Sequence, residues 1–150
     1  SHRCAPRRVL HRPQGGERHR HACRREGSRN RGKALAAYQW GRDWAGQANE
    51  KKRWKEERLG GGVPEAPVID GVTSEILQAY AIIGRSRQYV GMMGAPAPIG
   101  PAAIGDYLSR YPSAISREEF DSAIFALDDD FRKSWEEQQE RDNPKPPKKP

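Results

Sequence analysis

The clearest pattern of apolar and polar positions lies in the last third of the chain. Five apolar side chains recur there every three or four residues, a spacing that places them on one face of a helix. They are Phe120, Ile124, Leu127, Phe131 and Trp135. Ser116 precedes them, with Glu119 three residues later, which is the arrangement of a capping box at a helix N-terminus. The pattern predicts a long amphipathic helix that begins after Ser116.

Two shorter apolar patterns precede this helix. The first begins after Thr73 or Ser74, either of which can cap a helix, and is predicted to end around residues 90–91. Its inward side consists of Ile76, Leu77, Tyr80, Ile83 and Arg87. The second follows Pro101, a residue type favoured at the first helical position, and covers residues 102–111. The residues that it turns inward are Ile104, Tyr107 and Leu108.

A different pattern covers residues 33–59, where alanines and tryptophans are followed by a run of charges. If this segment is one continuous helix, five of its side chains lie on one face: Trp40, Trp44, Gln47, Lys51 and Trp54. The three glycines at 60–62 end the predicted helix, and two prolines keep the next residues extended. Residues 60–72 are therefore predicted to be a linker.

The two ends of the chain lack such patterns. Residues 1–32 are rich in Arg, His, Gly and Pro, and are predicted to be a disordered basic arm. Residues 143–150 are a Pro/Lys segment, predicted to be a disordered tail. The net charge of +7 belongs to the first end, because residues 1–33 carry eleven Lys/Arg against two Glu, a net of +9. The remaining residues sum to −2, so the charge does not mark them as a nucleic-acid-binding domain.

Together these patterns predict an all-α protein. A chain of 150 residues has room for one ordinary domain, and only 35% of its residues are hydrophobic. We expect a small three-helix bundle over residues 73–142, preceded by a separate aromatic helix over residues 33–59. No apolar run approaches the ~20 residues of a membrane-spanning helix, so no membrane partner is expected.

Candidate catalytic and metal-binding chemistry is sparse. All four histidines lie within the first 21 residues, so the predicted helical unit has no histidine for acid–base catalysis. His19, His21 and Cys23 do not follow the paired spacing of zinc ligands. Three successive acids, residues 128–130, spread through about 200° of a helix and are predicted to form a solvated acidic face. The sequence predicts no enzyme, no metal site and no cofactor.

The segment from Arg87 to Pro101 has the most distinctive composition. It contains methionines, prolines and small residues, and no histidine, cysteine or carboxylate. Flexible methionines offer adaptable apolar contact, and prolines limit the entropy that is lost on binding. Its candidate partner-binding residues are Arg87, Tyr89, Met92, Met93, Pro96 and Pro98. The alternative is that this segment plugs the helical bundle, with Met92 buried.

The tryptophans of the aromatic helix, Trp40, Trp44 and Trp54, are a second set of candidate partner-binding residues. With the neighbouring lysines they suit stacking on bases beside a phosphate backbone. They equally suit docking into a groove of a protein partner. A third interpretation, which we favour for these side chains, is that they pack on the C-terminal bundle.

Three short motifs connect the chain to a known family. They are Gly91-Met92-Met93-Gly94-Ala95-Pro96-Ala97-Pro98-Ile99, Ile104-Gly105-Asp106-Tyr107 and Ala126-Leu127-Asp128. With these motifs, residues 74–135 resemble the lambda-type tail assembly chaperones of long-tailed bacteriophages, small proteins encoded upstream of the tape-measure protein. The family form generally has glycine at the position of Met93 or Ala95, and this chain departs from it there.

The resemblance implies a non-enzymatic role. Chaperones of this family coat the tape-measure protein and help to recruit tail-tube subunits in the cytoplasm of the bacterial host, and they are absent from the mature virion. Two other functions stay open. One is a nucleic-acid-binding accessory protein that uses the basic arm and the Trp/Lys helix, and the other is a structural tail-completion protein that remains in the virion.

Overall fold

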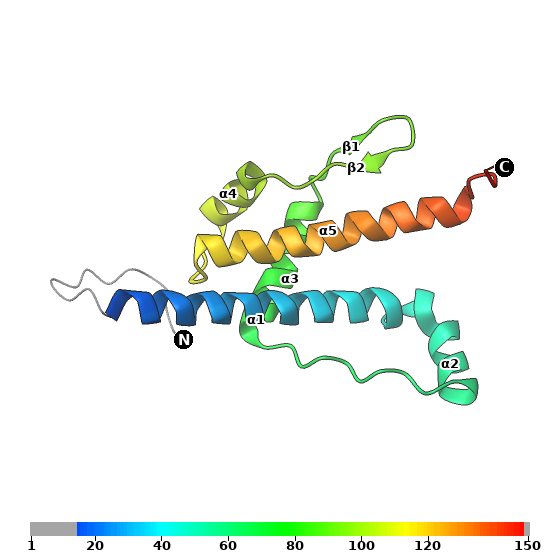
Figure 1. Ribbon diagram of the computed structural model, residues 1–150, viewed down its shortest axis with the longest axis horizontal. Coiled ribbons are helices and arrows are strands. Elements are labelled where there is room, and N and C mark those ends of the chain that lie inside the picture. The colour runs from blue at the N-terminus through cyan, green and yellow to red at the C-terminus, as the bar shows by residue number, and fades with distance from the viewer. Residues whose placement is uncertain (1–14, 149–150) are drawn as a thin grey trace.

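The computed structural model of the chain describes residues 15–148, with side chains described from residue 25 onward. Within that range the protein is mostly helical, which confirms the predicted fold class, and its strands form one short hairpin that the sequence did not predict (Figure 1). The elements are α1 (Gly15–Trp44), the 3-10 helix η1 (Gln47–Asn49), α2 (Glu50–Leu59), α3 (Gly71–Gly84), β1 (Tyr89–Val90), β2 (Ala95–Pro96), α4 (Pro101–Arg110) and α5 (Arg117–Asp142).

Helices α1 and α5 lie side by side and run in the same direction, and α3 crosses both of them (Figure 1). The parallel direction is evident from polar pairs whose offset along the chain is nearly constant. Asn30 donates to Glu119 and Arg42 donates to Ser134, across 89 and 92 residues respectively. Two helices that keep such a constant offset must have the same polarity.

The hydrophobic core lies where α1, α3, α4 and α5 meet. The predicted inward faces of the last three helices are largely confirmed, because their residues are either buried or, like Leu77, Tyr107, Leu108 and Phe131, partly buried against the core. Trp135, predicted on the same face of α5, is half-buried and is not part of this cluster. Each completely buried Phe or Ile contributes about 1.5–3 kcal/mol relative to its exposed state. The largest of these residues are Phe120, Ile76, Ile104, Ile124 and Leu127.

Helix α1 belongs to this core, so the prediction of a separate helix before a three-helix bundle was wrong. Ala34 and Ala37 are buried, and Leu35 and Tyr38 pack against the core from the same helix. The helix also begins earlier than residue 33, because residues 15–32 form its first half rather than the predicted disordered arm. Residues 1–14 lie outside the described range.

The predicted continuous helix over residues 33–59 is interrupted between α1 and α2. Gly46 has φ = 77°, a left-handed conformation that glycine adopts without the steric cost of a Cβ atom. Side chains from the following residues then satisfy the free carbonyls at the end of α1. Arg53 donates to the Trp44 carbonyl at 2.5 Å, and Lys52 donates to the Asp43 carbonyl at 3.1 Å. The break therefore replaces helical hydrogen bonds with side-chain caps.

The N-terminal ends of α3 and α5 are capped by different residues. Ser116 caps α5 as predicted, accepting a hydrogen bond from the Glu119 amide at 3.3 Å. Helix α3 is capped by Asp70, not by Thr73 or Ser74, and its carboxylate accepts from the Thr73 amide at 2.8 Å. Hydrogen bonding by Thr73, first through its backbone amide and then through its side chain, lowers the pKa of Asp70 from 3.8 to about 2, and the contact with Lys33 adds to this effect.

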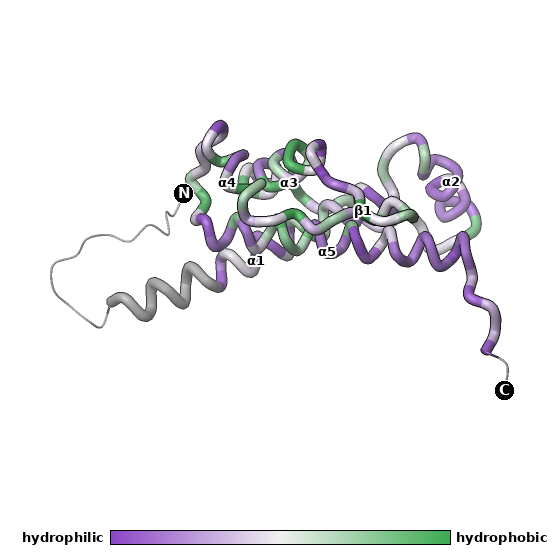
Figure 2. Tube along the Cα trace, turned by 90° about the horizontal axis from the view of Figure 1, so that it is seen from above, coloured by the Kyte–Doolittle hydropathy of each residue, from purple (hydrophilic) through white to green (hydrophobic). Residues whose placement is uncertain are grey.

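The remaining boundaries follow the glycines and prolines. Helix α3 ends at Gly84, earlier than predicted, and frees the next residues to form the hairpin. Residues 60–70 and 143–148 have no helix or strand, and the predicted Pro/Lys tail continues to residues 149–150 beyond the described range. Figure 2 shows the contrast between the apolar α3 and the mostly polar α2, which has no buried residue. Between residues 15 and 148, no helix has the length and apolar character needed to cross a membrane.

Candidate partner-binding site

The segment between α3 and α4 forms a β-hairpin that projects from the helices (Figure 1). Strands β1 and β2 are antiparallel, with Tyr89 opposite Pro96 and Val90 opposite Ala95. The turn between them begins and ends with glycines of positive φ, 75° at Gly91 and 65° at Gly94. Only glycine adopts this conformation readily, so the Gly-x-x-Gly spacing determines the local shape.

The tip of the hairpin is an exposed apolar surface. Met92 is 105% exposed and Met93 is 63% exposed, and Tyr89 and Val90 are also largely open to solvent. The alternative prediction that this segment plugs the bundle with Met92 buried was therefore wrong. We call these four residues the hairpin tip. Met92 and Met93 lie on the turn and Tyr89 and Val90 on the strand that leads to it, so together they expose apolar surface that a partner can contact.

The base of the hairpin is polar and buried. Arg87 and Asp128 form an ion pair with an Nη2–Oδ1 distance of 2.5 Å, and their side chains are only 3% and 2% exposed. The second Arg87 nitrogen, Nη1, donates to the Ala97 carbonyl at 2.9 Å. The second Asp128 oxygen, Oδ2, accepts from the Ile99 amide at 3.0 Å. One ion pair thus contacts both the beginning and the end of the hairpin segment.

Two aromatic residues complete the surroundings of Arg87. Its Nη2 atom also donates to the Tyr80 hydroxyl at 3.0 Å, and its guanidinium lies 4.5 Å from the centre of the Phe131 ring. Burial raises the pKa of the Tyr80 hydroxyl above its usual value of 10.0, which keeps the hydroxyl neutral. Tyr80 packs edge-on against Tyr38 of α1 at 5.6 Å, so the base of the hairpin is connected to three helices.

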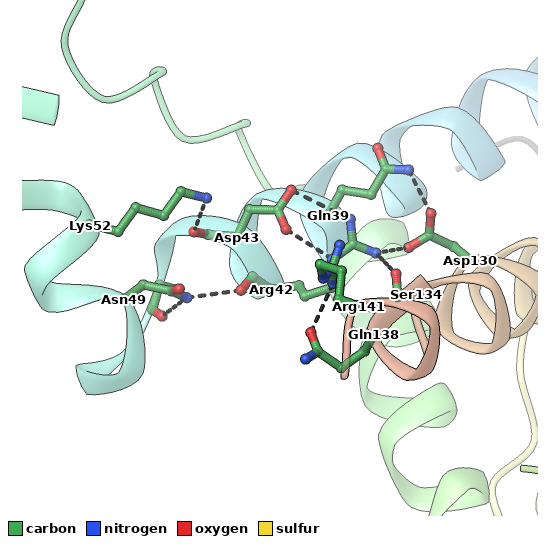
Figure 3. Close-up of polar contacts among 10 residues, drawn as sticks. Gln39, Arg42, Asp43, Asn49, Lys52, Asp130, Ser134, Gln138 and Arg141 are labelled. Atoms are coloured by element: carbon green, nitrogen blue, oxygen red, sulfur yellow. Dashed lines mark hydrogen bonds and ion pairs between the residues drawn. The ribbon is translucent and has the colours of Figure 1, made fainter. Parts of the chain in front are cut away.

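The prediction of a solvated acidic face over residues 128–130 was wrong for two of the three acids. Asp128 is buried against the hairpin, whereas Asp130 accepts hydrogen bonds from Gln39 and Arg42 of α1 (Figure 3). Asp129 alone is exposed. The burial of Asp128 could have been predicted from the sequence. Asp128 follows Ile124 by four residues and precedes Phe131 by three, a spacing that places it on the apolar face of the helix.

The other predicted site residues of this segment have separate surroundings. Pro96 is buried and Pro98 is exposed, and the following Ile99 is buried in the core. Arg87, predicted on the inward side of α3, lies beyond the end of that helix but does point inward. Arg87 and Pro96 therefore support the hairpin rather than forming its outer surface.

The three tryptophans do not form one helix face, and they are not part of the core. The Trp40 indole donates to the Pro64 carbonyl of the linker at 2.9 Å. Lys52 lies over the Trp44 ring at 4.2 Å, and Trp54 is 54% exposed on α2. The break at Gly46 separates Trp54 from the other two, and α2 lies at the opposite edge of the molecule from the hairpin (Figure 1).

Metal-binding groups are not assembled in the described part of the chain. Among those residues, no three or more His, Cys, Asp or Glu side chains lie close enough together to hold a metal ion. The side chains of His19, His21 and Cys23 lie outside the described set. An open groove between α1 and α5 is lined by three acids of α5, Glu118, Asp121 and Asp129. Arg31 of α1 also lines it and donates to the Ser122 hydroxyl at 3.0 Å.

Comparison of the chain with protein-family models, with curated proteins and with solved structures finds no match.

Proposed function

We propose that this protein is a non-enzymatic tail assembly chaperone that binds the tape-measure protein of a bacteriophage through the hairpin tip. The observation that carries the proposal is the full exposure of Met92 on a turn whose base is fixed in the core. The resemblance of residues 74–135 to tail assembly chaperones supplies the identity of the partner. In this proposal the protein acts in the host cytoplasm and is absent from the mature virion.

The composition of the tip suits a long, repetitive helical client. Methionine side chains have several rotatable bonds and a polarisable sulfur, so they adapt to successive apolar surfaces without strict shape matching. Tyr89 adds a broad ring with a polar end beside them. Tail-tube subunits are a second proposed partner, for which the exposed Trp54 on α2 is the candidate contact.

A binding measurement with the tape-measure protein tests the proposal. Burying one methionine is worth about 1.5–3 kcal/mol, so Met92→Ser with Met93→Ser is expected to weaken binding by roughly tenfold or more. A matched control is Val68→Ser with Ile69→Ser, which changes two adjacent exposed apolar residues in the linker. Equal binding by the wild type and the methionine variant would remove the hairpin tip from the contact.

The alternative function, nucleic-acid binding, has less support from the surroundings of its basic residues. Lys52 and Arg53 of the Trp/Lys helix are engaged with carbonyl oxygens at the end of α1. Phosphate-driven binding would lose about 10³-fold or more in affinity when salt rises fourfold, whereas apolar binding through the tip would change little. Mass spectrometry of purified virions tests the structural tail-completion alternative, because a chaperone is expected to be absent from them.

A further inference from the structure

We infer that Arg87 and Asp128 form a latch that fixes the direction of the hairpin relative to the helices. The latch consists of this ion pair together with its bonds to the Ala97 carbonyl and the Ile99 amide. This inference concerns the position of the hairpin and does not depend on which partner the tip binds.

The latch joins the two ends of the hairpin segment to a single carboxylate on α5. Arg87 precedes β1 and binds one Asp128 oxygen, whereas the amide of Ile99, which follows β2, binds the other. Arg87 also reaches directly across the segment to the Ala97 carbonyl. Both ends of the segment are thus held at one point. Loss of Asp128 removes the polar attachment of both ends to α5, whereas loss of Arg87 removes that of the first end and leaves the Ile99 amide bound to Asp128.

Few other contacts can hold the hairpin in place. Each strand has only two residues, and a hairpin of that length is not stable by itself in water. One hydrogen bond, from the Ala97 amide to the Gln88 carbonyl at 2.8 Å, closes the stem but does not attach it to a helix. The four tip residues are exposed, which leaves the latch and the buried side chains of Pro96 and Ile99 as attachments.

Replacing both latch residues at once separates the position of the hairpin from the stability of the helices. Replacing both members of a buried ion pair by apolar residues often preserves stability, because neither charge is left buried alone. Arg87→Met with Asp128→Leu is therefore expected to keep the helices folded. Neither new side chain can donate to the Ala97 carbonyl or accept from the Ile99 amide, so the hairpin loses its polar attachment. A matched control is Arg42→Met with Asp130→Leu, which removes the partly exposed ion pair between α1 and α5.

Hydrogen exchange of backbone amides in the full chain provides the test. In the latch variant, the amides of Ala97 and Ile99 are expected to exchange about tenfold faster or more, while buried amides of α3 and α5 keep their wild-type rates. The control variant is expected to leave the hairpin amides unchanged. Unchanged exchange at Ala97 and Ile99, or acceleration of all core amides in parallel, would overturn the inference. Asp128→Asn provides a second test, because its single acceptor oxygen faces two donors, Arg87 and the Ile99 amide. It also leaves the buried Arg87 charge without its counter-ion, so the core amides should accelerate as well. The amides of Ala97 and Ile99 are expected to accelerate more than the buried amides of α3 and α5, and equal acceleration of all of them would overturn the inference.

Discussion

Two arginine–aspartate pairs on α5 use the same chemistry in different surroundings. Asp128 and Asp130 are two residues apart, yet Asp128 pairs with Arg87 under the hairpin and Asp130 pairs with Arg42 of α1. The side chains of the first pair are 3% and 2% exposed, whereas those of the second are 34% and 15% exposed. Burial, and not the identity of the charged groups, separates the two sites.

The difference shows what a buried ion pair requires. Removing two charges from water is costly, and the cost is offset only when their remaining hydrogen-bonding positions are filled. Both Asp128 oxygens have donors, and Arg87 has three acceptors and an aromatic ring. The pair of Arg42 and Asp130, drawn in Figure 3, is partly exposed, so water can replace a lost partner.

The largest predicted effect breaks the buried pair. Asp128→Ala leaves the Arg87 guanidinium without its counter-ion in the core, and we expect the free energy of unfolding to fall by about 3–5 kcal/mol. Urea unfolding monitored by circular dichroism measures this loss. A loss below about 1 kcal/mol would mean that water reaches Arg87, which would contradict the burial of the latch.

A carboxylate at a helix end should have an intermediate effect. Asp70→Ala removes the N-cap of α3 and is expected to cost about 1 kcal/mol, whereas Asp70→Asn should retain most of the cap. The pKa of Asp70 is about 2 in the folded protein, below its ordinary value of 3.8, so its ionised form favours folding. This contribution is present above about pH 4 and is lost as the pH falls towards 2.

Measuring the free energy of unfolding between about pH 4 and pH 2 tests whether ionised Asp70 stabilises the fold. The difference in stability between the wild type and Asp70→Asn should shrink between about pH 4 and pH 2, because protonation removes the charge that the variant lacks. A difference that is constant with pH would show that the Asp70 charge plays no part in the cap.

Breaking the partly exposed pair of Arg42 and Asp130 should have a smaller effect than breaking the buried pair. Asp130→Ala is expected to lower the free energy of unfolding by about 0.2–1 kcal/mol. A double-mutant cycle with Arg42→Ala isolates the coupling energy, and molar salt should reduce it because partly exposed charges are screened. A coupling energy as large and as salt-independent as that of Arg87 with Asp128 would remove the contrast between the two pairs.

The smallest effect on stability should come from the hairpin tip. Met92→Ser with Met93→Ser changes side chains that have little contact with the core, so stability should remain within about 0.5 kcal/mol of the wild type. Thermal unfolding measures this directly. Substantial destabilisation would show that the tip packs onto the protein in solution.

The helices with strong apolar periodicity could be predicted from the sequence. Repeated large apolar side chains and a capping serine are local signals in the sequence. They were therefore sufficient to predict the inward faces of α3, α4 and α5 and the Ser116 cap. The first half of α1 had no such signal. It lies against α5 through the polar residues Asn30 and Arg31, which give no apolar pattern along the chain, so the helix could not be recognised without knowing that α5 packs beside it.

The candidate site was predicted only in part. The composition of residues 87–101 identified the segment, but two-residue strands cannot show an alternating pattern, so the hairpin itself was missed. The roles of Arg87 and Asp128 depend on a contact across 41 residues of chain. Arg87 and Asp128 are each a single charged residue among apolar positions. Either residue alone could be a solvated exception, and only the two together, with opposite charges, indicate a buried pair.

The exposure of Met92 and Met93 has a consequence for how this protein can evolve. Because the structure behind these two positions does not depend on them, natural variation or design can replace them without refolding the rest. The flanking Gly91 and Gly94 lack this freedom, since a Cβ atom at either would strain the turn. In the proposed function, residues that contact the client and residues that determine the fold are thereby separate positions, so the former can change while the scaffold stays the same.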